Sequence, residues 1–340
     1  MPDSGAPEKL DSANPTLLAG ASDRVDSVSR LGIWGRALWV LLYLLPKNAI
    51  SRWVGRFAAL RLPGPLQRAE LRFFARLAGV DLAEAARPLA AYPSLQAFFS
   101  RSLREGARPI EGDVHALTSP CDGTWGAAGP IDGGSLVQVK GRTYRVRDLL
   151  GDVDIADAYE GGFFATFYLS PRDYHRFHTP TAGRFRRLDY WPGALWPVNH
   201  VGLNAVDALF ATNERICAYL EPDGVVESDV VYEVVGAIAS EHVRSTIAMV
   251  AIGATMVGSV RLSFDDLTTN RSHAVPESRG LGAASAYFER GAEWGHFEFG
   301  STIVMLMAPD TFDLEVQPVG TPVRLGEVIG RRCGHSDGET

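Results

Sequence analysis

The sequence predicts an α+β protein, with N-terminal amphipathic helices followed by a mainly antiparallel β catalytic domain. Up to Ile110, apolar residues and arginines mix in stretches typical of helices. Beyond Ile110, short apolar or alternating runs are separated by Gly, Pro and Asp pairs, as in strands and turns. Helices first and strands afterwards is the order of an α+β fold. Hydrophobic residues make up 46% of the 340, enough for a globular core.

Two segments are expected before the catalytic domain. Residues 1–28 are rich in Ser, Asp, Ala and Pro, which predicts a disordered leader, and their start lacks the features of a signal peptide. Residues 29–82 are expected to be a membrane-associating helical segment. Between Arg30 and Val80 lie nine basic residues and one acidic residue, in a chain whose net charge is −7.

The helical segment is expected to lie on a membrane surface. Its longest uncharged apolar run, Ala37–Leu45, has nine residues, whereas a spanning helix needs roughly 20. Aromatic residues such as Trp53 and Phe57 alternate with arginines, a mixture typical of helices in the interface of an anionic membrane. The alternative, a helical hairpin that packs on the body with its arginines solvated, stays open.

Residues 83–335 form the expected catalytic domain. A helical stretch is predicted over residues 83–106, before Pro109, and a second helix around residues 201–212. Strands are predicted at residues 135–139, 163–169, 215–220, 230–238, 245–252, 258–264, 297–307 and 312–316.

Composition excludes several classes of function. The three cysteines form no C-x-x-C pair, which predicts neither a zinc site nor a disulfide framework and favours a reducing compartment. His175 and His178 form an H-x-x-H pair, but no neighbouring cluster supplies a third ligand, and we expect no metal. The net negative charge argues against a general nucleic-acid-binding protein.

Three short motifs hold the candidate catalytic residues. Taken singly, they are typical of a turn carboxylate, a pair of structural histidines and a glycine bulge in a strand. Taken together, an Asp, a His and a Ser supply an orienting group, a base and a nucleophile. The motifs are SPCDG at residues 119–123, with Asp122; SPRDYHRFHTP at residues 170–180, with His175 and His178; and FGST at residues 299–302, with Ser301.

The surroundings of Ser301 distinguish it from a hydrolase serine. It does not lie in the G-x-S-x-G turn of the α/β hydrolases. Instead, it directly follows Gly300 inside a run typical of a strand. A glycine can adopt backbone conformations closed to other residues, and its carbonyl is open to attack by the next side chain. This is the arrangement that an N-to-O acyl shift requires.

Five motifs follow one another along the chain: FFSRSLREGARPI, SPCDG, YHRFHTP, PVNHVGLNAVDALFATNERI and FGST. In this order they resemble the bacterial-type phosphatidylserine decarboxylase proenzymes, over residues 31–330. A sixth stretch, LLPKNAISRWVGRFA, is also similar to the bacterial branch. Phe299, Cys121 and Trp294 depart from the commonest residues at their positions, Leu, Ala and Met, without changing a group that the chemistry needs.

The resemblance implies a pyruvoyl-dependent enzyme that cleaves itself between Gly300 and Ser301. His178, oriented by Asp122, takes the hydroxyl proton of Ser301, whose oxygen attacks the Gly300 carbonyl to give an ester. Elimination and hydrolysis then leave a pyruvoyl group at position 301. The products are a β chain, residues 1–300, and an α chain, residues 301–340, which stay together as a heterodimer. Thr302 is a candidate oxyanion donor.

The resemblance also implies the reaction of the mature enzyme, a carboxy-lyase of phospholipid biosynthesis. The pyruvoyl at residue 301 forms a Schiff base with phosphatidylserine, and loss of CO₂ yields phosphatidylethanolamine. His175 is the candidate acid that protonates the carbanion. The implied location is peripheral, at the cytoplasmic face of the cell's inner membrane. Acyl-chain preference and assembly into a higher oligomer are left open.

Three other functions stay open. A non-catalytic peripheral membrane protein of the carrier type would need a modified lysine, and Lys140 lacks the expected flanking residues. An Asp-His-Ser lipid hydrolase would keep Ser301 intact. A pyruvoyl decarboxylase acting on a soluble amino acid would have no use for the basic N-terminal segment.

Overall fold

A computed structural model describes residues 47–137, 143–198, 202–203, 206, 208–224, 246–255, 259–282, 285–298 and 302–334. By its internal contacts the chain divides into two units, residues 1–45 and residues 46–340. Every element named below belongs to the second unit. The expected leader lies outside the described residues, as does the first part of the segment 29–82. The expected boundary after residue 82 stays a prediction.

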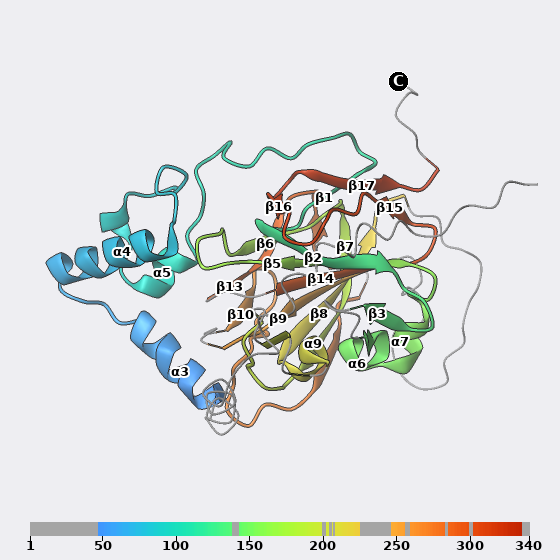
Figure 1. The fold of residues 1–340 in the computed structure, drawn as a ribbon, viewed down its shortest axis with the longest axis horizontal. Helices are drawn as coiled ribbons and strands as arrows, with labels where there is room; N and C mark the ends of the chain where they lie inside the picture. The colour runs from blue at the N-terminus through green and yellow to red at the C-terminus, as the bar shows by residue number, and fades with distance from the viewer. Residues whose placement is uncertain are drawn as a thin grey trace, which may run out of the picture. The chain divides into compact units, whose positions relative to one another are not determined.

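Helices come first in the described chain, coloured blue and cyan in Figure 1. The two longest are α3 (Lys47–Ala58) and α4 (Gly64–Ala78). Pro65 lies in the first turn of α4, where a missing N–H needs no partner. The helix ends at Gly79, whose left-handed φ of 77° lets its amide donate to the Ala75 carbonyl. Within the described part of the chain, no helix has the length and apolar character needed to span a membrane.

Helix α4 is apolar on two sides. Leu71 and Ala75, four residues apart, are buried with Phe98 in a small cluster. Phe73 and Leu77, also four apart, are exposed. Packing within the unit therefore uses only one of the two apolar stripes of this helix.

The long helix expected over residues 83–106 is wrong for most of its length. Pro88 and Pro93 account for this, because proline removes an N–H donor and disfavours helix at the preceding residue. The chain resumes a helix where the Ser94 hydroxyl accepts a hydrogen bond as an N-cap. The structure has only two short helices in this stretch: η2 (Leu89–Ala91) and α5 (Leu95–Phe99).

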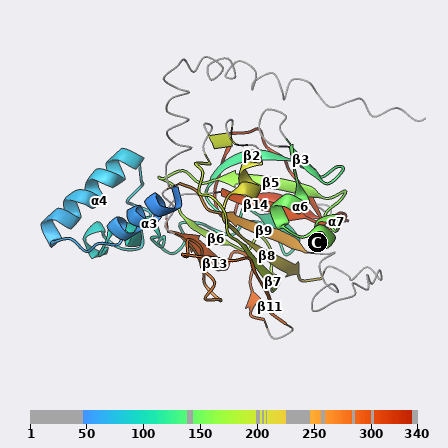
Figure 2. The same cartoon turned by 90° about the horizontal axis from the view of Figure 1, so that it is seen from below.

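The large sheet has nine strands, and all of its pairings are antiparallel. Its order is β11-β7-β8-β9-β14-β5-β2-β16, with β12 paired to β7. Figure 2 shows β2, β5, β14, β9, β8 and β7 side by side in this order. Their bounds are β2 (Gly123–Pro130), β5 (Phe163–Tyr168), β7 (Gly183–Trp191), β8 (Arg215–Pro222), β9 (Ile247–Ile252), β11 (Glu277–Gly280), β12 (Tyr287–Phe288), β14 (Thr302–Met307) and β16 (Pro322–Val323).

Strand β14 lies in the interior of this sheet, between β5 and β9. Its first residue, Thr302, is opposite Tyr168 on one side and Ile252 on the other. All six side chains of β14 are buried, as expected for the near-continuous apolar sequence TIVMLM. The core of the protein therefore forms around this strand.

Three smaller sheets and several short helices complete the described chain. The sheets have the orders β1-β17-β15, β10-β13-β6 and β3-β4. Their strands are β1 (Ala116–Thr118), β3 (Ser135–Val137), β4 (Thr143–Arg145), β6 (Arg176–His178), β10 (Val260–Leu262), β13 (Glu293–Phe297), β15 (Phe312–Leu314) and β17 (Val328–Arg332). The helices are α6 (Val146–Leu150), α7 (Val153–Asp157) and α9 (Leu209–Thr212).

Helices followed by a mainly antiparallel β region confirm the expected α+β class. The helix expected around residues 201–212 is represented by α9, and the strand expected at 230–238 lies outside the described residues. The single strand expected over 297–307 is instead divided between two sheets. Phe297 ends β13 in one sheet, and Thr302 begins β14 in another.

Candidate active site

The segment that follows β5 and ends with β6 carries the two candidate histidines. It turns at Asp173, whose carboxylate accepts hydrogen bonds from the amide and the hydroxyl of Ser170, both at 2.7 Å. His175 and His178 follow and are buried. Strand β6 pairs with β13, and the Phe297 amide donates to the His175 carbonyl at 2.9 Å. The histidines are thus tied to the strand that leads towards Gly300.

His178 is held as a neutral base. Its Nδ1 lies 2.8 Å from the Gly291 carbonyl oxygen, and because a carbonyl only accepts, Nδ1 carries the proton. The Nε2 lone pair is then free to accept, and the hydroxyl of Tyr174 lies 3.2 Å from it. Burial lowers the pKa of His178 below its ordinary value. The imidazole is therefore uncharged at neutral pH, with Nε2 as its basic atom.

His175 has the same tautomer in a drier setting. Its Nδ1 donates to the Asp173 carbonyl at 2.9 Å, and its ring lies against that of Phe99, with centroids 3.9 Å apart. Burial, reinforced by the charge of Arg101, lowers the pKa of His175 to about 3. Its Nε2 is buried and has no hydrogen-bond partner within the described part of the chain. Such an orphaned polar atom is costly unless a ligand or a reacting group uses it.

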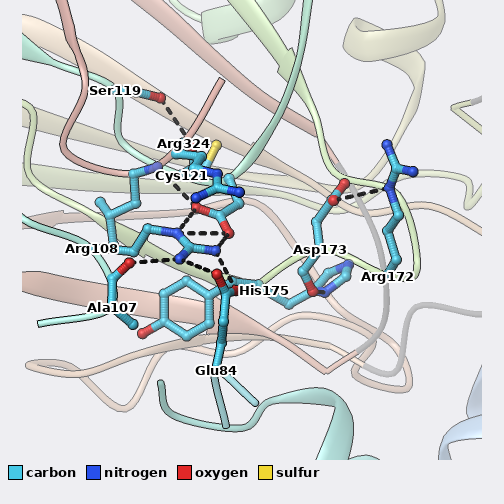
Figure 3. Close-up of polar contacts among 12 residues, drawn as sticks. Glu84, Ala107, Arg108, Ser119, Cys121, Arg172, Asp173, His175 and Arg324 are labelled. Atoms are coloured by element: carbon cyan, nitrogen blue, oxygen red, sulfur yellow. Dashed lines mark hydrogen bonds and ion pairs between the residues drawn. The ribbon is translucent and has the colours of Figure 1, made fainter. Parts of the chain in front are cut away.

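Asp122 lies at the end of the tight turn that begins β2. The Arg108 guanidinium holds its carboxylate with Nε at 2.8 Å and Nη2 at 2.6 Å, and the Leu325 amide donates to it at 2.9 Å. The same guanidinium binds the Glu84 carboxylate at 2.8 and 3.0 Å, as Figure 3 shows, and lowers the pKa of Glu84. Asp122 therefore belongs to a Glu84–Arg108–Asp122 network whose Arg108–Asp122 pair is buried and whose Glu84 is partly exposed.

Asp122 acts on His178 through its charge in this structure. The Nδ1 atom of His178 is bonded to a backbone carbonyl and Nε2 to Tyr174, while the Asp122 oxygens are taken by Arg108 and Leu325. The hydrogen bond to Gly291 and the charges of Glu293 and, to a smaller extent, Asp122 raise the pKa of His178 and partly offset its burial. The direct hydrogen bond by which Asp122 would orient His178 stays a prediction.

The strand ends that border the expected cleavage site converge on this region. Gly123, next to Asp122, approaches β5 so closely that an added Cβ would lie 2.4 Å from the Tyr168 carbonyl oxygen. Tyr168 is in turn opposite Thr302 on β14. Gly300 and Ser301 themselves lie outside the described residues. The structure thus brings Asp122, through Gly123 and Tyr168, to the end of the sheet where β14 begins.

Several residues of this region were not found from the sequence. Tyr174 and Arg101 lie in motifs that were noted for other residues, and Glu84 lies in a stretch interpreted as helix. An arginine or tyrosine next to a motif gives no signal of its own, because its partners come from distant segments. In the described part of the chain, no group of three or more His, Cys, Asp or Glu residues is placed to hold a metal ion.

Comparisons with known proteins identify the class to which this fold and site belong. The family model for phosphatidylserine decarboxylase matches residues 95–331. The phosphatidylserine decarboxylase proenzyme of Myxococcus xanthus (strain DK1622) is 37% identical over 292 residues, which cover 85% of this chain and 96% of that protein. The proenzyme of Anaeromyxobacter sp. (strain K) is 40% identical over 293 residues, with the same coverage.

A third relative, from Brevibacillus brevis (strain 47), is 37% identical over 268 residues, covering 78% of this chain and 87% of that protein, and is also a phosphatidylserine decarboxylase proenzyme. Family match and relatives agree over nearly the whole described chain. The chain belongs to the phosphatidylserine decarboxylase family, a family of carboxy-lyases.

Proposed function

We propose that this chain is a proenzyme that cuts itself between Gly300 and Ser301 and then decarboxylates phosphatidylserine to phosphatidylethanolamine, with a pyruvoyl group at position 301. One observation carries the proposal beyond family membership. Two buried, neutral histidines, both with Nε2 unprotonated, lie on the segment that hydrogen-bonds to Phe297, three residues before Gly300.

In the cleavage step, His178 is the base. Its Nε2 accepts the hydroxyl proton of Ser301, while Nδ1 stays bonded to the Gly291 carbonyl and fixes the ring. The imidazolium formed in this way is stabilised by the charge of Asp122, which raises the pKa of His178. Such base assistance is typically worth roughly 10²–10⁴-fold in rate.

Thr302, the second residue after the proposed cut, is buried and fixed, which suits a small uncharged group on its amino side. Thr302 is 1% exposed and is paired on both sides, so a group attached to its nitrogen begins a strand that cannot shift. The orphaned Nε2 of His175 supports a ligand or reacting group beside it. When present, an α-keto group supplies an electrophilic carbonyl that binds the substrate amine and withdraws the electrons released as CO₂ leaves.

His175 is proposed to handle the proton that replaces CO₂. Its Nδ1 proton is held by the Asp173 carbonyl, so only Nε2 is able to exchange a proton with the substrate. Because its pKa is lowered to about 3, His175 has to gain a proton during the reaction before it donates one. A negative charge brought in by the substrate would favour that protonation.

We also propose that the helical segment binds anionic membranes at their cytoplasmic face. Trp53 and Phe57 on α3 are 59% and 66% exposed, and Phe73 and Leu77 on α4 are 68% and 75% exposed. Exposed apolar side chains among arginines are typical of interfacial helices. Cys121 and Cys217 are buried and lie in no disulfide, which supports a reducing compartment.

Intact mass spectrometry of the purified protein tests the cleavage. We expect two chains, residues 1–300 and 301–340, the shorter beginning with a keto group in place of serine. A single chain of 340 residues with an unmodified Ser301 would remove the proposed cofactor. The remaining candidates would then be an Asp-His-Ser hydrolase and a carrier protein. A serine-directed phosphonate would label the hydrolase and would not label the carrier protein.

A further inference from the structure

Arg101 is a buried cation beside the candidate active site. It follows α5 and is only 4% exposed. One of its nitrogens, Nη2, donates to the carbonyl oxygens of Arg172 at 3.0 Å and Asp173 at 3.3 Å. The side chain therefore reaches from the N-terminal helical region to the segment that carries His175.

The other two nitrogens of Arg101, Nε and Nη1, are buried and have no hydrogen-bond partner within the described part of the chain. Arg215 provides the contrast, since it is equally buried, at 4% exposed. All three of its side-chain nitrogens donate to backbone carbonyls, among them those of Leu149, Asn213 and Asp148. All side-chain nitrogens of Arg215 are thus used in holding the fold, whereas two side-chain nitrogens of Arg101 donate to no group in the described part of the chain; we call these two its reserved donors. A buried charge without partners is destabilising.

The side chains of Arg101 and His175 meet at one backbone oxygen. Both side chains donate to the same oxygen, the carbonyl of Asp173: His175 through Nδ1 at 2.9 Å and Arg101 through Nη2 at 3.3 Å. The charge of Arg101 also contributes to the lowered pKa of His175. Around one backbone oxygen, the structure gathers a cation with two free donors and a base with a free lone pair.

The reserved donors Nε and Nη1 do not form a fork, because the parallel pairs of a guanidinium are Nε with Nη2 and Nη1 with Nη2, as Arg108 shows on Asp122 and Glu84. Each of them therefore offers a single charge-assisted hydrogen bond to an oxygen of a carboxylate or a phosphate. A phosphatidylserine headgroup carries both anions. Arg101 on the carboxylate would stabilise the reactant more than the transition state, because that charge disappears as CO₂ leaves. A phosphodiester keeps its charge throughout the reaction, so binding it does not oppose the chemistry.

We propose that Arg101 binds the phosphodiester of the substrate headgroup through one of these two reserved donors and so holds the reacting serine beside His175. This inference rests on the proposed function and deepens it. Its effect is uniform binding of substrate and transition state, so loss of Arg101 raises KM and leaves kcat nearly unchanged. A bound phosphodiester would also offset the positive charge that helps to keep His175 neutral.

The test uses the mature two-chain enzyme, because Arg101 is covered in the uncut chain. Two headgroup fragments serve as inhibitors of phosphatidylserine turnover in detergent micelles. Glycerophosphoethanolamine has the phosphodiester without the carboxylate, and L-serine has the carboxylate without the phosphodiester. In Arg101→Gln, we expect inhibition by glycerophosphoethanolamine to weaken on the order of 100-fold, the usual size for loss of a buried charge pair. Inhibition by L-serine should change by less than about threefold, and Arg101→Lys should recover part of the loss.

Each other pattern of inhibition would overturn the proposal. Selective loss of L-serine inhibition would assign Arg101 to the carboxylate. Equal weakening of inhibition by both fragments would mean that Arg101 only holds the loop at Asp173 in place. The control Arg215→Gln should behave in this way, because its effect is on the stability of the fold. Unchanged inhibition by both would remove Arg101 from binding. The wild-type enzyme is first tested for self-cleavage and for release of CO₂ from phosphatidylserine. Failure of the wild type in these tests would contradict the proposed function rather than the role of Arg101.

Discussion

The hydroxyl of Tyr174 lies 3.2 Å from Nε2 of His178, the atom that we assign as the base for self-cleavage. Since Nδ1 carries the imidazole proton, the tyrosine hydroxyl is the donor in this contact. A hydrogen bond donated to a lone pair stabilises the unprotonated base and so opposes proton uptake. In the uncut chain, Tyr174 would thus compete with Ser301 for the atom that we propose as its base.

Replacing Tyr174 with phenylalanine tests this competition. The Tyr174→Phe protein should cut itself at least as fast as the wild type, because Nε2 of His178 loses a competing donor and keeps its Gly291 anchor. The measurement is the fraction of cut chain over time, resolved on a denaturing gel after synthesis. If the variant stays uncut, the hydroxyl carries the proton between Ser301 and His178 and is not a competitor.

The two histidines should separate the two reactions. His178→Ala should slow self-cleavage by roughly 10²–10⁴-fold, the usual contribution of a general base, and yield a largely uncut chain. His175→Ala should still cut itself to some degree but turn over phosphatidylserine poorly. Chain masses report the first reaction, and CO₂ release per cut molecule reports the second. Full turnover in His175→Ala would exclude this residue from the mechanism.

Arg108 should be essential to the fold around Asp122. Arg108→Met leaves two carboxylates, those of Asp122 and Glu84, without their shared cation. Breaking a buried ion pair costs about 3–5 kcal/mol, measurable as a lower free energy of unfolding in urea. The control is Arg147→Met, whose pair with Asp148 is exposed and 3.8 Å long; it should cost no more than about 0.5 kcal/mol. Equal losses in both variants would contradict the network.

Acidification should destabilise the protein below about pH 6.5, the ordinary pKa of histidine. The folded pKa values of His175 and His178 are lowered by burial, that of His175 to about 3. Between pH 6.5 and those values the unfolded chain binds more protons than the folded one, so stability falls as pH falls. In an uncut Ser301→Ala background, His175→Gln should show a shallower loss of urea stability from pH 6.5 to 5.5. A slope identical to that of the parent would contradict the buried neutral state.

The exposed apolar stripe of the helical segment should govern binding to membranes. The double variant Trp53→Ala/Phe57→Ala removes two large apolar side chains from α3, each worth about 1.5–3 kcal/mol when buried. Partition onto vesicles of anionic phospholipid should therefore fall by at least about 100-fold, measured by co-sedimentation. Val275 is 68% exposed on the β region, and Val275→Ala serves as the control. Unchanged partition of the double variant would refute the anchor.

The local character of the chain could be predicted from the sequence, but its long-range pairings could not. The apolar run TIVMLM predicts a buried strand on its own. That this strand lies between β5 and β9 depends on a register set by the whole sheet. Likewise, the helix expected over residues 83–106 failed because apolar and basic residues matched the period of a helix while Pro88 and Pro93 broke it.

The candidate site shows the same division. Asp122, His175 and His178 were predicted because their residue types and motifs suggest chemistry, and the structure finds all three buried. Arg108 and Arg101 looked like other arginines of a basic stretch. Their roles become visible only when Arg108 is found on Asp122, and Arg101 on a carbonyl 72 positions along the chain. Which charges are buried is decided by tertiary packing, and no periodicity in the sequence records it.

The place of β14 in the large sheet gives the proposed cut an enduring consequence. Hydrogen bonds to β5 and β9 would keep the shorter fragment in place once its covalent link was gone, so native size would be unchanged. Refolding would not be equivalent, because two separated fragments must find each other at a rate that depends on concentration. The lifetime of the mature enzyme would then be set by the rate at which it unfolds, because the continuous chain from which it folded no longer exists.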